Sequence, residues 1–149
     1  MKHQLKLGVR TWLHLNRIMY TVGRRLSGHL EHYDLTLAQF GVLAHLQAAP
    51  HISQQALADW LSVTKGNIVG LLNRLEDRGL VERRPDPADR RRTIVQVIPG
   101  QATLIGHWLD GAARPLARVL DKLTPDEQET FLKAMDLLET ELHRQDTGT

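Results

Sequence analysis

Apolar residues near the start of the chain recur at alternating intervals of four and three positions. The positions of this repeat are Leu5, Val9, Trp12, Asn16, Met19, Gly23, Leu26 and Leu30, of which only Asn16 and Gly23 are not apolar side chains. Residues with such spacing share one face of an α-helix. Leu15, Ile18 and Val22 widen the apolar face beyond the needs of one core. The pattern therefore predicts a long helix over residues 5–30 that also packs against a partner helix.

Three helix starts follow in the middle of the chain, each marked by a hydroxyl side chain that can cap a helix. These hydroxyl residues are Thr36, Ser53 and Thr64, and the predicted helices run over residues 37–49, 54–61 and 65–78. The side chains expected to point inward are Phe40, Leu43, Leu46, Ala56, Leu57, Trp60, Ile68, Leu71, Leu72 and Leu75. Gly79 is suited to the left-handed conformation that ends a helix. Because only Ser62 and Val63 lie between the second of these helices and Thr64, the cap of the third, the two helices must cross steeply.

Two strand-like segments, residues 80–84 and 93–98, flank a charged stretch rich in turn-forming residues. This arrangement predicts a β-hairpin. Its tip, residues 85–92, holds three consecutive arginines that face only Asp86 and Asp89 as acids. The hairpin is therefore expected to present positive charge.

Helical spacing returns after residue 100 and continues to the polar tail of the chain. The side chains expected to point inward are Leu104, Trp108, Leu116, Val119 and Leu123, and Pro115 is expected to kink the helix. Thr124, Pro125 and Glu127 then combine a cap, a proline at the first helical position and a capping-box acid. The final helix continues the apolar ladder through Phe131, Met135, Leu138 and Leu142.

Composition narrows the classes of protein. A chain of 149 residues with 42% hydrophobic residues favours one domain, and the absence of cysteine excludes disulfides, cysteine-based zinc sites and thiol redox sensing. No secretory or membrane-spanning pattern is seen, so we expect a soluble, cytoplasmic protein without a membrane partner. The net charge is only +2, but residues 101–149 hold five basic and nine acidic residues, so a nucleic-acid surface is expected in the preceding part.

Enzyme chemistry finds little support in the motifs. The sequence has no phosphate-binding glycine loop, no His-Glu-x-x-His motif, no Gly-x-Ser-x-Gly elbow and no cysteine nucleophile. His29 and His32 lie at helical spacing beside Glu31, but this spacing alone is weak support for a metal site. We expect no enzyme activity, no metal and no cofactor, with these histidines on the surface.

The order of helices, turn, helix and basic hairpin predicts a winged helix-turn-helix. A helix fits the major groove of DNA, and an arginine on a narrow hairpin suits the minor groove. Asn67 can bind adenine through two hydrogen bonds, Lys65 can reach guanine or a phosphate, and Arg91 is the candidate for the minor groove, held by Asp89. The start of the helix at Gln54 offers backbone amides to a phosphate. The residues predicted to contact DNA are Ser53, Gln54, Gln55, Thr64, Lys65, Gly66, Asn67, Val69, Gly70, Asn73, Arg74, Asp89, Arg90 and Arg91.

Residues 63–68, 75–83 and 86–91 closely resemble the recognition helix and wing of the MarR (multiple antibiotic resistance regulator) family. Two positions depart from the family pattern: Val97-Ile98 replaces a leucine-threonine pair, and Gly70 replaces an arginine in the recognition helix. These departures bear on the DNA sequence that is bound. The resemblance implies one domain over residues 1–149, with a DNA-binding lobe at 36–98 and dimerisation helices within 5–33 and 100–144. The fold class is then mainly α with a small antiparallel β wing.

The family resemblance also implies a homodimer that binds a pseudo-palindromic operator in double-stranded DNA, as a repressor responsive to a small aromatic or anionic effector. The residues expected at the dimer interface are Leu5, Val9, Trp12, Phe131, Met135, Leu138 and Leu142. The residues expected to line an effector site are Trp12, Asn16, Arg17 and Phe40. An alternative is a protein-interaction module that kept the fold but lost DNA binding.

Overall fold

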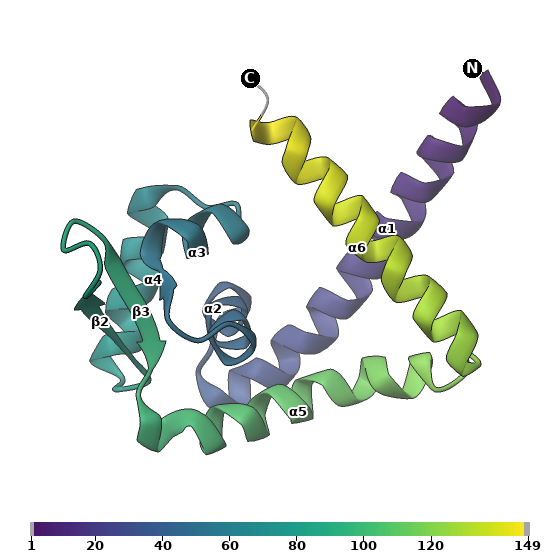
Figure 1. The fold of residues 1–149 in the computed structure, drawn as a ribbon. Coiled ribbons are helices and arrows are strands. Elements are labelled where there is room, and N and C mark those ends of the chain that lie inside the picture. Colours follow the sequence, from purple (N-terminus) through teal and green to yellow (C-terminus); the bar gives the residue numbers. More distant parts are fainter. Residues whose placement is uncertain (1, 148–149) are drawn as a thin grey trace. The chain divides into compact units, whose positions relative to one another are not determined.

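The computed structural model describes residues 2–147, and the side chains of residues 2–5, 143 and 145–147 lie outside the description. The helices are α1 (Lys2–Leu30), α2 (Leu37–Ala48), α3 (Gln54–Trp60), α4 (Lys65–Asp77), α5 (Ala102–Leu120) and α6 (Pro125–Thr147), with short 3-10 turns η1 (Glu31–Tyr33) and η2 (Pro99–Gln101). The strands are β1 (Ile52–Ser53), β2 (Val81–Pro85) and β3 (Thr93–Val97) (Figure 1). The predicted fold class, mainly helical with a small antiparallel wing, is confirmed.

The helix starts lie where the capping residues predict them. The Thr36 hydroxyl accepts a hydrogen bond from the Gln39 backbone amide, and the Thr36 backbone amide donates to the Gln39 side-chain oxygen, which completes a capping box. Ser53 and Thr64 cap α3 and α4 in the same way through one bond each. Gly79 has a φ of +66°, the left-handed conformation in which glycine has no Cβ penalty, and it turns the chain from α4 into β2.

The sheet has three strands in the order β1-β3-β2, all antiparallel. The β2–β3 hairpin is the predicted wing. β1 was not predicted, because two residues are too short to show the alternation that marks a strand. Ile52 pairs with Val95 and Ser53 with Ile94, so β1 ties the start of α3 to the wing.

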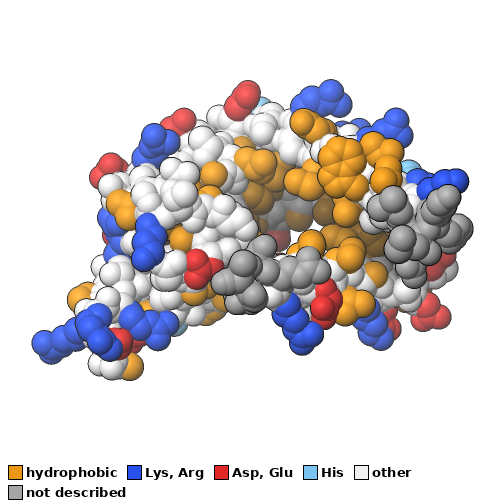
Figure 2. Space-filling view, turned by 90° about the horizontal axis from the view of Figure 1, so that it is seen from above, with side chains coloured by type: hydrophobic (Ala, Val, Ile, Leu, Met, Phe, Trp, Pro, Cys, Tyr) orange, Lys and Arg blue, Asp and Glu red, His pale blue; other side chains and the backbone are white. Residues whose placement is uncertain are grey.

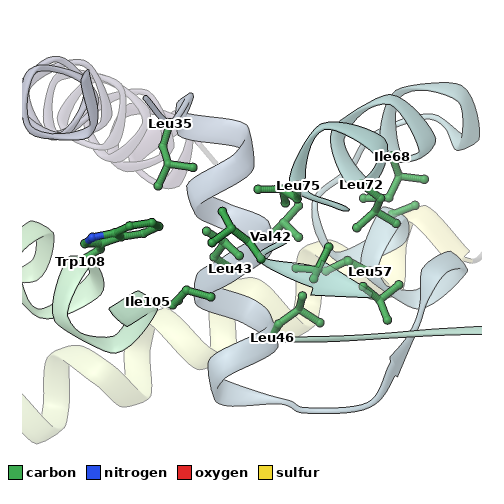
Figure 3. Close-up of a cluster of buried hydrophobic side chains, with 14 of the residues drawn as sticks. Leu35, Val42, Leu43, Leu46, Leu57, Ile68, Leu72, Leu75, Ile105 and Trp108 are labelled. Atoms are coloured by element: carbon green, nitrogen blue, oxygen red, sulfur yellow. The ribbon is translucent and has the colours of Figure 1, made fainter. Parts of the chain in front are cut away.

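The core surrounds α2 (Figure 3), and helices α3 and α4 together with the sheet supply most of its other side chains. Its fully buried members include Val42, Leu43, Leu46, Leu57, Ile68, Leu72, Leu75, Val95 and Ile105. Phe40 and Leu71 are half-buried against this core, and Trp108 is buried as predicted.

Four side chains predicted to point inward are exposed: Trp60, Leu104, Leu116 and Val119. Trp60 is 43% exposed because the inner side of the short helix α3 is filled by Leu57 and Ala58. Its ring instead packs on the ring of His45, 4.1 Å away, and burial lowers the pKa of that histidine. For the other three, helical periodicity identifies an apolar face but does not reveal what covers it.

The chain forms two compact units, residues 1–112 and 113–149. In the second unit, Thr124 and Glu127 form the predicted capping box at the start of α6. α5 continues through Pro115. No helix within the described residues is long and apolar enough to cross a membrane. The division into a DNA-binding lobe and dimerisation helices stays a prediction.

Candidate nucleic-acid interface

The first turn of α4 presents polar side chains to solvent while the opposite face of the helix is anchored. Ile68, Leu72 and Leu75 are buried in the core, which fixes the rotation of the helix about its axis. The predicted contact residues on the other face are therefore all exposed: Lys65, Gly66, Asn67, Val69, Gly70, Asn73 and Arg74. Thr64 accepts a hydrogen bond from the Asn67 backbone amide (3.2 Å), so the cap leaves the Asn67 side chain to reach outward.

A groove of about 230 Å³ brings together three predicted parts of the interface: the start of α3, the start of α4 and the wing. The groove is lined by Ser53, Gln54, Gln55, Lys65, Ile68, Arg91, Arg92 and Thr93. These residues are far apart in sequence, and the β1–β3 pairing is what places the first of them beside the last.

Two of the three predicted contact residues at the start of α3, Ser53 and Gln55, form hydrogen bonds with residues of α3. The Ser53 hydroxyl is taken by the Ala56 amide at 3.1 Å, and the residue is only 8% exposed. Ser53 therefore shapes the groove by capping α3. The Gln55 side chain donates to Asp59 (2.7 Å), one turn further along the same helix. Gln54 is half-buried in the groove wall.

The wing tip holds Arg91 in the arrangement expected from sequence. The Arg91 guanidinium donates to both carboxylate oxygens of Asp89, at 3.0 and 3.2 Å, and its backbone amide donates to the same carboxylate at 3.1 Å. These hydrogen bonds lower the pKa of the Asp89 carboxyl below its ordinary value. The Arg91 side chain is 91% exposed, against 33% for Asp89. The ion pair thus directs the guanidinium into solvent from a fixed base.

The other wing arginines differ in how far they are neutralised. Arg84 pairs with Glu82 at 2.8 Å, and Arg92 lies 3.9 Å from Asp86. Arg90 is exposed and has no ion pair among the residues that the structure describes. In Figure 2 the Lys and Arg side chains, in blue, gather at the lower left, on the side where the wing lies in Figure 1.

A link between α4, which is the predicted recognition helix, and the wing was not predicted from the sequence. Arg83, in the middle of β2, donates from its backbone amide (2.8 Å) and its Nε (2.9 Å) to Glu76 of α4, and a terminal nitrogen forms an ion pair with the same carboxylate. It also donates to the side-chain oxygen of Asn73 at 2.6 Å. Asn73 therefore serves the wing through its oxygen, and only its amide nitrogen remains for the predicted DNA contact. Glu76 and Arg83 lie seven positions apart on either side of Gly79, and this spacing across a helix-to-strand turn is the signal that could have revealed them.

We expect Glu76→Gln to reduce the free energy of unfolding by on the order of 1 kcal/mol at neutral pH, because it removes the charge that Arg83 pairs with. Hydrogen bonding by Arg83 lowers the pKa of Glu76, with burial opposing it. The contribution is therefore present above the ordinary glutamate pKa and is lost as the pH falls through the lowered folded value. Urea unfolding at neutral pH and near pH 3 measures this, and a gap between the two proteins that stays constant with pH would contradict it.

The predicted effector residues do not yet define a site. Trp12 and Arg17 are exposed on α1, Asn16 is half-buried there, and Phe40 packs against the core from α2. The effector site stays a prediction. At the predicted dimer interface, Val9, Trp12, Phe131, Met135, Leu138 and Leu142 are exposed, and the side chain of Leu5 lies outside the described residues.

Helices α3 and α4 with the basic β2–β3 wing define a winged helix-turn-helix, a class of DNA-binding fold. A model of the MarR family matches residues 33–92. The multiple antibiotic resistance protein MarR of Salmonella typhimurium (strain LT2) is 33% identical over 122 residues, covering 78% of this chain and 85% of the relative. The chain belongs to the MarR family and is a transcriptional regulator. Because its relatives are regulators, the prediction that it is not an enzyme is confirmed.

Solved structures share the fold. A crystal structure of MarR has a TM-score of 0.74 and 32% identity, covering 91% of this chain and 92% of that one. A Staphylococcus aureus MepR–DNA complex has a TM-score of 0.70 and 21% identity, covering 88% of this chain and 96% of the other.

Proposed function

We propose that the chain is a sequence-specific repressor that binds a pseudo-palindromic operator as a homodimer and responds to a small effector. One observation carries the DNA-binding part of this proposal: the exposed first turn of α4 and the projecting Arg91 border the same groove. The start of α4 has the shape to enter a major groove, and the basic hairpin tip beside it has the shape to enter the adjacent minor groove. The MepR relative of the same fold has been captured on DNA, which supports the same use here.

We assign the reading of bases to the side chains of α4. The residues around α4 are assigned to holding the protein on the DNA backbone and in the minor groove. Asn67 presents a donor and an acceptor suited to adenine, and Lys65 a cation suited to guanine or a phosphate. Arg91 adds charge where a narrow minor groove concentrates negative potential. Gln54 and Gln55 lie at the start of α3, where phosphate contacts set the register of the protein on the duplex.

Dimerisation is supported by large apolar side chains that are exposed to solvent on α1 and α6. α1 exposes Trp12 (61%), Met19 (71%) and Tyr20 (75%), and α6 exposes Leu137 (63%) and Leu142 (61%). Exposed apolar side chains of this kind are orange in Figure 2. Contiguous apolar surface on a regulator marks a protein interface. A two-fold dimer would place two recognition helices on half-sites about one helical turn, ~10 base pairs, apart.

Repression follows if the operator overlaps a promoter, since a bound dimer occludes polymerase. A small aromatic or anionic effector would act by binding more tightly to dimers whose recognition helices are wrongly spaced, and its leverage equals that difference in affinity. We assign the protein to the cytoplasm, where its DNA is found.

Selection of bound duplexes from a random pool, followed by sequencing, tests the function directly. The purified full chain is expected to enrich a two-fold symmetric motif at near-physiological salt. Enrichment of an asymmetric motif would remove the homodimer from the proposal. No enrichment by a folded dimer would favour a module that kept the fold for protein interaction.

We expect Asn67→Ala to relax the selected motif at one base position in each half-site. A good bidentate contact discriminates against the wrong base by about 1–3 kcal/mol, and alanine has no group to replace it. The same selection checks this, with Thr103→Ala, an exposed polar change on α5, as a control. A motif unchanged from the wild type would show that Asn67 does not read a base.

A further inference from the structure

Arg78 joins the far end of the recognition helix to the turn that follows α1. It is the C-cap residue of α4, and its two terminal nitrogens donate to consecutive backbone carbonyls: to Asp34 at 2.6 Å and to Tyr33 at 2.8 Å. The planar guanidinium fork suits two adjacent acceptors in a way that a single ammonium does not. Arg78 lies 44 positions after Asp34 in the sequence, so this is a tertiary contact.

The turn at Tyr33 and Asp34, whose carbonyls accept from Arg78, has an uncommon backbone conformation. Asp34 has a φ of +52°, in the left-handed region that residues other than glycine seldom adopt. Carbonyls at the end of a helix lack intrahelical donors, and a cationic side chain is a favourable partner for them. The conformation of this turn and the position of Arg78 therefore support each other.

Tyr33 extends the tie to a second helix. While its carbonyl accepts from Arg78, its ring stacks on the buried ring of Trp108 in α5, with centroids 5.1 Å apart. The same ring also makes an edge-to-face contact with the ring of His29 in α1, with centroids 5.2 Å apart. One residue thus connects the end of the recognition helix with α1 and α5.

The position of Arg78 separates it from the residues assigned to base reading. It lies 13 residues after Lys65, which corresponds to about 20 Å along a helix. Base edges are met by the first turn of a recognition helix. Arg78 is therefore placed to hold the helix and not to read DNA.

We infer that Arg78 is a positioning residue that fixes the recognition helix relative to α1 and thereby sets the spacing between half-sites that the dimer accepts. This inference rests on the proposed function, because spacing has meaning only for a dimer on a two-part operator. α1 carries part of the predicted dimer interface. An α4 held rigidly to α1 therefore holds the two recognition helices at one separation.

The test uses the full chain and duplexes that carry the two selected half-sites with zero, one or two base pairs added or one removed between them. Wild type is expected to bind one spacing best. Arg78→Gln is expected to reduce the preference for that spacing over a one-base-pair insertion by about fivefold, because a fivefold change corresponds to the net contribution of one hydrogen bond. The salt dependence of DNA binding is expected to stay unchanged. Arg78→Lys keeps the charge but loses the fork, so it is expected to behave like the glutamine variant.

Arg118→Gln is the control for the loss of an exposed arginine, because Arg118 lies on α5, outside the residues assigned to DNA binding, and has no hydrogen bond or ion pair among the described contacts. It is expected to keep the wild-type spacing preference. Thermal unfolding checks that each variant folds. If Arg78→Gln does not fold, Arg78→Lys is used for the same measurement.

Three results would overturn the inference. Arg78→Gln that keeps the full spacing preference removes the positioning role. Equal weakening at every spacing, with a salt slope reduced by about one and rescue by lysine, would make Arg78 a phosphate contact. Wild type that binds one half-site as tightly as two would instead overturn the proposed function, and the inference with it.

Discussion

Leu138→Glu is expected to convert the proposed homodimer into monomers and to lower operator affinity by more than about a hundredfold. Leu138 lies on α6, where it is 43% exposed within its own chain and flanked at helical spacing by Phe131, Met135 and Leu142, which are also exposed. A carboxylate buried at such an interface without a partner costs several kcal/mol, and each protomer would contribute one. A monomer contacts only one half-site and loses the gain from simultaneous binding.

Light scattering with in-line chromatography gives the mass directly, and binding to the selected operator gives the functional loss. Leu138→Met is the control at the same position, since it keeps volume and apolarity and should leave the dimer intact. Circular dichroism confirms that α6 stays helical in both variants. A dimer mass for the glutamate variant would move the interface away from this face of α6.

The sequence predicted those parts of the fold that depend on neighbours along the chain. Thr36, Ser53 and Thr64 mark helix starts because a cap acts within three residues, and the structure has all three bonds. The Asp89–Arg91 pair was predicted for the same reason, because its members lie two residues apart on a tight turn. Local chemistry of this kind is readable without knowing the fold.

Features that depend on distant partners were not predicted. The hydrogen bonds from Arg78 to the backbone carbonyls of Tyr33 and Asp34 leave no pattern in the sequence, and the Glu76–Arg83 pair is marked there only by its spacing across Gly79. Trp60 has the spacing of an inward residue, yet Leu57 and Ala58 fill the inner side of α3 and Trp60 stays exposed. Periodicity gives the direction of an apolar side chain but not whether another element reaches it.

Interface residues are predictable to an intermediate degree. The exposed face of α4 follows from its buried face, because Ile68, Leu72 and Leu75 fix the rotation of the helix. What the sequence could not indicate is which of those exposed groups are already engaged. The Asn73 side-chain oxygen is occupied by Arg83, whereas the Asn67 side chain stays free of the cap that uses its backbone. Asn67 is therefore the stronger candidate for reading a base.

Arg91→Ala is expected to weaken operator binding by about 1–3 kcal/mol, roughly a five- to 150-fold rise in Kd, and to reduce the salt slope by about one. The geometry of the wing tip is the reason that we expect so large an effect on DNA affinity from one side chain. Asp89 holds the guanidinium by two hydrogen bonds, so little side-chain freedom remains to be lost on binding, while 91% of the side chain is free to meet DNA. A narrow minor groove then supplies the negative potential that a fixed guanidinium meets best.

Two controls separate this role from general positive charge. Arg84→Ala removes another exposed wing arginine, but one that lies on β2 and is paired with Glu82, and is expected to weaken binding much less. Asp89→Asn keeps Arg91 and removes the charge that orients it, so it should weaken binding by less than the loss of Arg91 and leave the salt slope near the wild-type value. Equal losses for Arg84→Ala and Arg91→Ala would mean that the wing acts as a diffuse cation, and minor-groove insertion by Arg91 would then be wrong. A larger loss for Arg91 alone, with a lower slope, is the result that a preorganised arginine in the minor groove requires.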